Sequence, residues 1–128
     1  MVERTESKEF SEFEGTVEQV EEVDSKLKDN SKQYKLSLKT QISSTGYMYE
    51  WINIPETAKG DSVPEGSNLD KYLIEVEMLH SEVKEISTVA DALKFLVGKT
   101  YLFKKKKLGK SYKGQEAKEF WVPVKEIQ

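Results

Sequence analysis

The chain of 128 residues has no cysteine and a single histidine, His80. Without thiols it can form no disulfide, no thiolate zinc site and no cysteine nucleophile. One histidine provides neither a histidine metal cluster nor a histidine-based catalytic pair, and we expect His80 on a helix face. The acidic residues Glu75, Glu77 and Glu82 are spaced as exposed helix charges, and no paired carboxylates with a partner base are evident. The sequence therefore predicts a protein that is not an enzyme and needs no metal or cofactor.

Long apolar runs are also missing. No stretch approaches the ~18 consecutive apolar residues that a membrane-spanning helix requires. The first fifteen residues, MVERTESKEFSEFEG, have no apolar core of the kind found in a secretory signal. Together with the absence of cysteine, this predicts a cytoplasmic protein with no membrane partner.

Arginine is scarce, because Arg4 is the only one in the chain. The net charge of −3 hides a strong segregation: residues 1–24 carry −7, residues 25–54 carry +3, residues 55–91 carry −6 and residues 92–128 carry +7. Two basic segments can form a basic face on a protein that is acidic overall. Lysine is a compact charge suited to phosphate, whereas bidentate reading of bases usually uses arginine. Any nucleic-acid binding is therefore expected to have low sequence specificity.

Three strands are predicted in the first half of the chain. Residues 13–23 alternate with a bend at Gly15 and a bulge near Val17–Val20. The alternation is clearest in residues 34–42, where Tyr34, Leu36, Leu38, Thr40 and Ile42 share one face. A turn at residues 43–46 leads to a third strand, residues 47–54, which Pro55 ends.

The second half predicts two helices followed by two strands. After a loop at residues 55–68, apolar residues at helical spacing run from Leu69 to Val83, with Asn68 as the expected N-cap. A second helix is expected from about Ser87 or Thr88 to Val97, with Gly98 at its C-terminal end. Strands are predicted at residues 99–106 and 119–127, with a connector at 107–114. Alternation places Phe120 and Trp121 on opposite faces, so one of them is expected in the core.

The element order and several short phrases resemble OB-fold single-stranded nucleic-acid-binding proteins of the small archaeal and phage type. The phrases are FEGTVEQVEEV, NLDKYLIEVEMLHSEV, ALKFLVGKTYLFKK and EFWVPVKEI, and the likeness covers about residues 11–127. It implies a mainly β fold with a helical insertion: a five-stranded OB-type Greek-key barrel in which three strands, the helices and two further strands follow in order. Residues 11–128 would form this domain, after a flexible acidic segment at residues 1–10. The resemblance also implies a binding surface on the second and third strands, flanked by loops.

Strand alternation tests that implication. If Leu36 and Leu38 point into a barrel, Lys35 and Lys39 point outward. On the third strand, an inward aliphatic set leaves an aromatic row outside, consisting of Tyr47, Tyr49 and Trp51. Bases stack on such rings while lysines follow the phosphates. In the alternative orientation the rings are core residues. Glu50 shares the aliphatic face and could lie at the barrel rim.

A second candidate surface is the lysine-rich hairpin near the end of the chain. Residues 92–115 contain eight lysines and no acid. We expect phosphate contacts from a cluster made of Lys104, Lys105, Lys106, Lys107, Lys110, Tyr112 and Lys113. The alternative is a solvated edge whose lysines prevent pairing between sheets.

These observations predict a non-enzymatic module that binds single-stranded nucleic acid, DNA more than RNA, with no small-molecule substrate. The alternative is an OB-type protein-interaction module within a larger replication or repair assembly. In that case Tyr49 and Trp51 would form a hydrophobic hot spot and the lysines would meet an acidic partner.

Overall fold

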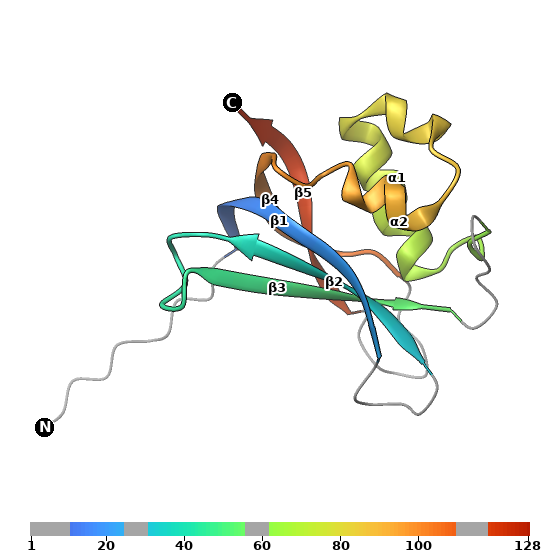
Figure 1. Ribbon diagram of the computed structural model, residues 1–128, viewed down its shortest axis with the longest axis horizontal. Helices are drawn as coiled ribbons and strands as arrows, with labels where there is room; N and C mark the ends of the chain where they lie inside the picture. The colour runs from blue at the N-terminus through green and yellow to red at the C-terminus, as the bar shows by residue number, and fades with distance from the viewer. Residues whose placement is uncertain (1–10, 25–30, 56–61, 110–117) are drawn as a thin grey trace, which may run out of the picture.

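The computed structural model describes residues 11–24, 31–55, 62–109 and 118–128. Within these ranges the chain is mainly β, with a helical insertion between the third and fourth strands (Figure 1). The elements are β1 (Glu12–Asp24), β2 (Lys32–Lys39), β3 (Tyr47–Ile54), α1 (Asn68–Leu79), the 3-10 helix η1 (Ser81–Glu85), α2 (Val89–Lys94), β4 (Thr100–Lys107) and β5 (Glu119–Ile127). This is the order of elements that the sequence predicts.

The five strands form one antiparallel sheet with the order β3-β2-β1-β4-β5. The chain runs through β1, β2 and β3 as a meander. It then crosses through the helices to place β4 on the other side of β1. Within the described residues, β3 and β5 are the two edges of the sheet and no ladder joins them.

The long strand β1 belongs to both halves of the sheet. Its first part, Glu12–Thr16, pairs with β4, and its second part, Thr16–Asp24, pairs with β2. Thr16 is the junction, because it faces Lys39 on one side and Thr100 on the other. The register with β2 shifts between Val17 and Gln19, which confirms the expected bulge.

Gly15 lies close to the end of β2. A Cβ at this position would lie 3.0 Å from Cε2 of Phe13 and 3.3 Å from the carbonyl oxygen of Lys39. The Phe13 ring has little room to move, since its centroid lies 5.2 Å from that of Phe103 and 4.8 Å from that of Trp121. Glycine therefore allows the two strands to approach each other at this bend.

The core fills one face of the sheet and is covered by the helices. The predicted inward residues Leu36, Leu38 and Ile52 are fully buried. Helix α1 packs against β5 and β3, the two edge strands, and Figure 1 shows it with α2 at one side of the sheet. Its Tyr72 is completely buried, and the hydroxyl donates a 2.8 Å hydrogen bond to the carbonyl oxygen of Trp121.

The helices begin and end at other residues than the sequence predicts. The N-cap of α1 is Ser67 rather than Asn68, since the Ser67 hydroxyl accepts from the backbone N–H of Asp70 at 3.2 Å. The apolar stripe from Leu69 to Val83 does not form one helix, because α1 ends before His80 and Val83 lies in η1. Helix α2 is only six residues long, and Gly98 follows it with φ of 85°.

His80 is not an exposed helix-face residue. It is 8% exposed, and its Nε2 lies 2.7 Å from the hydroxyl oxygen of Tyr101 on β4. The imidazole also packs edge-on against Phe95 and Tyr101. The helix ends here because His80 has extended backbone angles that turn its side chain into the core.

Two expectations for the strands are also wrong. Strand β2 ends at Lys39, so Thr40 and Ile42 lie in the turn, and Ile42 is 38% exposed. Phe120 and Trp121 are both buried, at 1% and 9% exposure. Alternation fails on β5 because α1 covers this strand, with Tyr72 packing edge-on against Phe120, while Phe13 of β1 packs against Trp121.

Candidate nucleic-acid interface

The three predicted aromatic residues of β3 form a continuous row on the outer face of the sheet. Tyr49 is 39% exposed and Trp51 is 40% exposed, while Tyr47 is half-buried. The ring centroids of Tyr47 and Tyr49 are 6.3 Å apart with planes 14° from parallel, and those of Tyr49 and Trp51 are 5.9 Å apart. Because Ile52 between Trp51 and Asn53 is buried, the strand presents the rings outward. The interior alternative for these rings is therefore wrong.

The outward lysines of β2 lie beside this row. In the β2–β3 ladder Lys35 faces Trp51 and Lys39 faces Tyr47. The Lys35 ammonium lies 4.6 Å from the centroid of the Tyr49 ring, a cation–π contact. We name the surface formed by Lys35, Lys39, Tyr47, Tyr49 and Trp51 the β2–β3 platform.

An acidic side chain that the sequence reasoning missed lies at the Tyr47 end of the platform. The Tyr47 hydroxyl donates a 2.9 Å hydrogen bond to Glu18 Oε2, and Lys39 Nζ lies 3.9 Å from Glu18 Oε1. The hydrogen bond raises the pKa of Tyr47. Glu18 lies at the bulge of β1, where the register with β2 shifts. The alternation pattern predicts the bulge but not the direction in which the Glu18 side chain points.

A second missed residue, Lys118, lies at the other end of the platform. Its Nζ donates a 3.3 Å hydrogen bond to the carbonyl oxygen of Trp51 and lies 4.8 Å from the centroid of the Phe120 ring. Lys118 precedes β5, and only the approach of the two edge strands brings it to β3. The sequence shows a lysine directly before the last strand, but it does not show that the two edge strands approach each other.

The lysines of β4 do not form one cluster in the described residues. Lys104 Nζ lies 3.6 Å from Glu12 of β1, whereas Lys106 Nζ lies 3.3 Å from Glu75 of α1. Lys105 lies 5.2 Å from the centroid of the Trp121 ring, and Lys107 is exposed at the end of the strand. Successive side chains of a strand point to opposite sides, which separates Lys105 from Lys104 and Lys106. The other predicted members, Lys110, Tyr112 and Lys113, lie outside the described residues.

Glu50 is buried beneath the platform rather than placed at an exposed rim. It is 7% exposed, and its Oε1 has no hydrogen-bond partner. Burial raises the pKa of this carboxyl group to about 7, against the opposing effects of Lys118, a hydrogen bond from the backbone of Trp121, and Lys105. Glu50 and Lys118 thus connect the two edge strands through side chains.

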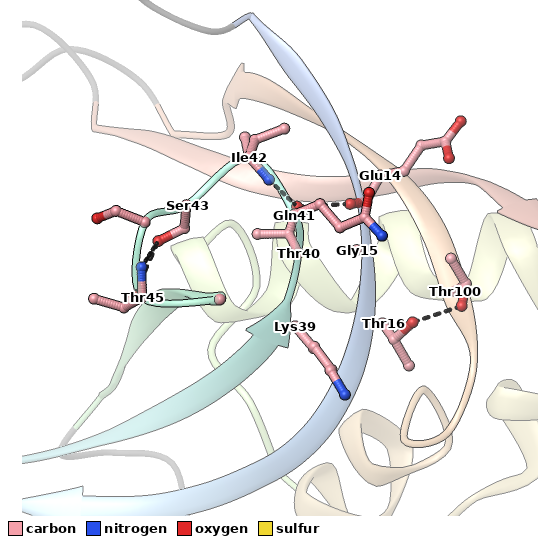
Figure 2. A pocket seen from close by; sticks show the side chains of 12 residues that line it. Glu14, Gly15, Thr16, Lys39, Thr40, Gln41, Ile42, Ser43, Thr45 and Thr100 are labelled. Atoms are coloured by element: carbon pink, nitrogen blue, oxygen red, sulfur yellow. Dashed lines mark hydrogen bonds between the residues drawn. The ribbon is translucent and has the colours of Figure 1, made fainter.

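An open hollow of about 980 Å³ is lined in part by Lys39, the platform residue that faces Tyr47 in the β2–β3 ladder (Figure 2). It is walled by residues 14–16 of β1, by Lys39 with the β2–β3 turn at residues 40–46, and by Thr100 of β4. Six of its twelve lining residues carry a hydroxyl group. The hydroxyl oxygens of Thr16 and Thr100 are 2.6 Å apart, and Thr40 donates to the carbonyl oxygen of Glu14 at 2.9 Å.

Neither a model of a known protein family nor a curated protein matches the sequence of this chain. Among the described residues, no group of three or more histidine, aspartate or glutamate side chains is placed to hold a metal ion. No helix in the described part of the chain is long and apolar enough to cross a membrane.

Proposed function

We propose that the protein is an OB-type barrel that binds single-stranded nucleic acid on the β2–β3 platform, DNA more than RNA, with low sequence specificity. The observation that carries this proposal is the row of Tyr47, Tyr49 and Trp51 beside Lys35 and Lys39. Base stacking on an aromatic side chain contributes about 1–3 kcal/mol and every base has a π-face, so such a surface tolerates any sequence.

The topology supports the barrel. The order β3-β2-β1-β4-β5, with helices inserted between β3 and β4, has the connectivity of the five-stranded OB barrel. The edge strands approach each other, because Lys118 donates to Trp51 of β3 and the backbone of Trp121 hydrogen-bonds to Glu50. Helix α1 packs on both edge strands, as a helix that closes one end of a barrel would.

Electrostatics support a ligand with a phosphate backbone. Lys35 and Lys39 flank the rings on one side, and Lys118 reaches the backbone of Trp51 from the β5 edge. Because the described residues contain lysine but no arginine, the surface offers point charges for phosphate rather than forks for base edges.

Tryptophan fluorescence provides the test, since Trp51 is exposed and Trp121 is buried. Titration with oligothymidylate of about twelve nucleotides should quench the emission of Trp51, with an affinity that falls steeply as salt rises. Trp51→Ala should weaken binding by roughly 5- to 150-fold. Trp121→Phe is the matched control and should retain the quenching. An absence of binding to both oligothymidylate and oligouridylate at low salt would overturn the proposal.

A protein-interaction module remains the second candidate, and the exposed apolar residues of α1 favour it. Ile74 is 44% exposed and Met78 is 75% exposed, one turn apart on the same helix face. If the platform serves a protein partner instead, Tyr49 and Trp51 supply the hot spot. Oligonucleotides would then fail to compete with that partner for the protein.

A further inference from the structure

The edge strands β3 and β5 meet along a seam that is held by side chains. No ladder joins these two strands within the described residues. The start of β5 nevertheless reaches the middle of β3 (Figure 1), where Lys118 donates to the carbonyl oxygen of Trp51. The backbone N–H of Trp121 donates to the carboxyl group of Glu50. We call the region formed by Glu50, Trp51, Lys118 and Trp121 the β3–β5 seam.

The seam can open without breaking a ladder. Strand β3 keeps its pairing with β2, and β5 keeps its pairing with β4. The backbone of Trp121 is also held from α1, because its carbonyl oxygen accepts the 2.8 Å hydrogen bond from Tyr72. The bond between Trp121 and Glu50 therefore joins β5 to β3, and the ionisation of Glu50 can alter it.

Glu50 lies in the seam as a buried carboxyl group with too few partners. It is 7% exposed, and its Oε1 has no hydrogen-bond partner. Among the described residues, no ion pair involves Glu50. A carboxylate that loses its hydration without gaining partners is strongly destabilised, whereas the neutral acid loses much less. The closed seam therefore favours the protonated form of Glu50.

Two lysines near Glu50 oppose this preference. Lys118, directly before β5, and Lys105 of β4 both favour the carboxylate. Each ammonium group has another contact, however: Lys118 donates to the carbonyl oxygen of Trp51, and Lys105 lies 5.2 Å from the centroid of the Trp121 ring. The lysines therefore weaken the effect of burial without cancelling it.

The other elements around Glu50 add little that would favour its charge. On β2 the residue opposite Glu50 is the apolar Leu36. On α1, burial and then the charges of Glu50 and Glu75 raise the pKa of Tyr72 well above its ordinary value of 10.0, so Tyr72 stays neutral. Glu75 itself pairs with Lys106 of β4. Burial consequently has the largest effect on Glu50 and raises its pKa to about 7.

We propose that the β3–β5 seam is a pH-dependent gate, which stays closed while Glu50 carries its proton and opens locally when the carboxyl group ionises. In the open state water reaches the carboxyl group, so its pKa returns towards the ordinary value of 4.5. Between this value and about 7 the closed state retains a proton that the open state has lost, so rising pH favours opening. Above this range the effect is constant. The gate belongs to the sheet itself and operates without a ligand on the platform.

Hydrogen exchange of the Trp121 backbone N–H measures the gate, because this group is bonded to Glu50 when the seam is closed. Its protection factor, which corrects for the intrinsic pH dependence of exchange, should fall on the order of 10- to 100-fold from about pH 5 to about pH 8. Low urea concentrations should hardly change this protection at the higher pH, since local opening exposes little surface. Protected amides of the β1–β2 ladder, which need global unfolding, should lose protection as urea is added.

Two variants assign the effect to Glu50. Glu50→Gln is neutral at every pH and its side-chain oxygen can still accept from Trp121, so the fall in protection should disappear. Glu119→Gln removes an exposed carboxyl group at the start of β5 and should retain the fall. Equal protection of Trp121 at both pH values, or the same fall in Glu50→Gln, would overturn the gate. A urea dependence of Trp121 exchange that matches the β1–β2 amides would also overturn it, because opening would then be global.

Discussion

Lys118 Nζ donates a 3.3 Å hydrogen bond to the carbonyl oxygen of Trp51, and this bond joins the start of β5 to the edge of β3. The residue that carries the exposed indole is thus held in place by a lysine from the opposite edge of the sheet. A carbonyl at a sheet edge has no strand partner, and Lys118 supplies one.

We expect Lys118→Met and Lys118→Gln to separate the two roles of this side chain. Both variants lose a charge beside the platform, so the slope of log K against log salt should become shallower by about 0.7. The amide of glutamine can still donate to Trp51, whereas methionine cannot. Urea unfolding should show a small loss of stability for the methionine variant alone, because the hydrogen bond is exposed to solvent. An unchanged salt slope in both variants would show that Lys118 does not contact the ligand.

The buried carboxyl group of Glu50 predicts an unusual pH dependence of stability. Its pKa rises from the ordinary value of 4.5 to about 7, so between these pH values the folded protein retains a proton that the unfolded chain has lost. The free energy of unfolding should therefore decrease as pH rises from 4.5 towards 7, and the contribution of Glu50 should be constant above that range.

Glu50→Gln removes this titration while preserving the shape of the side chain. At pH 8 the variant should be more stable than the original protein by roughly 1–3 kcal/mol, and near pH 4 the two should be similar. Urea unfolding at several pH values measures the difference. The same pH slope in both proteins would show that Glu50 is not its source.

If a nucleic-acid strand binds the platform as proposed, Glu18 should compete with it at the Tyr47 end. Its carboxylate accepts from Tyr47 and lies 3.9 Å from Lys39, where a phosphate would approach. Glu18→Gln should therefore tighten oligothymidylate binding by about two- to fivefold, as judged by Trp51 quenching. Glu22→Gln is a suitable control, because Glu22 pairs with Lys32 at the far end of β2. A weaker binding of the Glu18 variant would mean that the carboxylate positions the platform instead.

The buried contact between His80 and Tyr101 predicts a loss of stability on removal of one hydroxyl. Tyr101→Phe leaves the ring in place but removes the hydroxyl that lies 2.7 Å from His80 Nε2. The free energy of unfolding should therefore fall by about 1–3 kcal/mol. Tyr47→Phe removes a hydroxyl whose hydrogen bond is exposed to solvent and should change stability by much less. Thermal unfolding of the two variants provides the comparison, and equal midpoints would contradict it.

The sequence predicts the platform well because strand alternation depends on local burial. Leu36 and Leu38 alternate with polar residues on β2, and on β3 Ile52 shares its parity with Met48 and Ile54. Once these residues point inward, the rings of Tyr49 and Trp51 must point outward. The bulge in β1 was also visible, as a change of parity between Val17 and Val20. These features need no knowledge of distant contacts.

Features that depend on tertiary partners could not be predicted in the same way. Phe120 and Trp121 are both buried because α1 and β1 pack against β5, which alternation along β5 alone does not encode. His80 resembles a surface helix residue until Tyr101, 21 residues away, supplies its partner. Lys118 and Trp51 are 67 residues apart, and only the approach of the two sheet edges brings them together.

The pairing of β1 with two different strands affects the order in which the sheet forms. At Thr16 the strand passes from β4 to β2, so its second part pairs with a segment that follows closely in the sequence. Its first part can pair only once Thr100 and the following residues of β4 are present. Pairings between distant segments form slowly because long loops must close first, and during synthesis the N-terminal part of a chain emerges first. The hairpin that carries the aromatic row can therefore form early, and the junction at Thr16 is completed only after β4 has emerged.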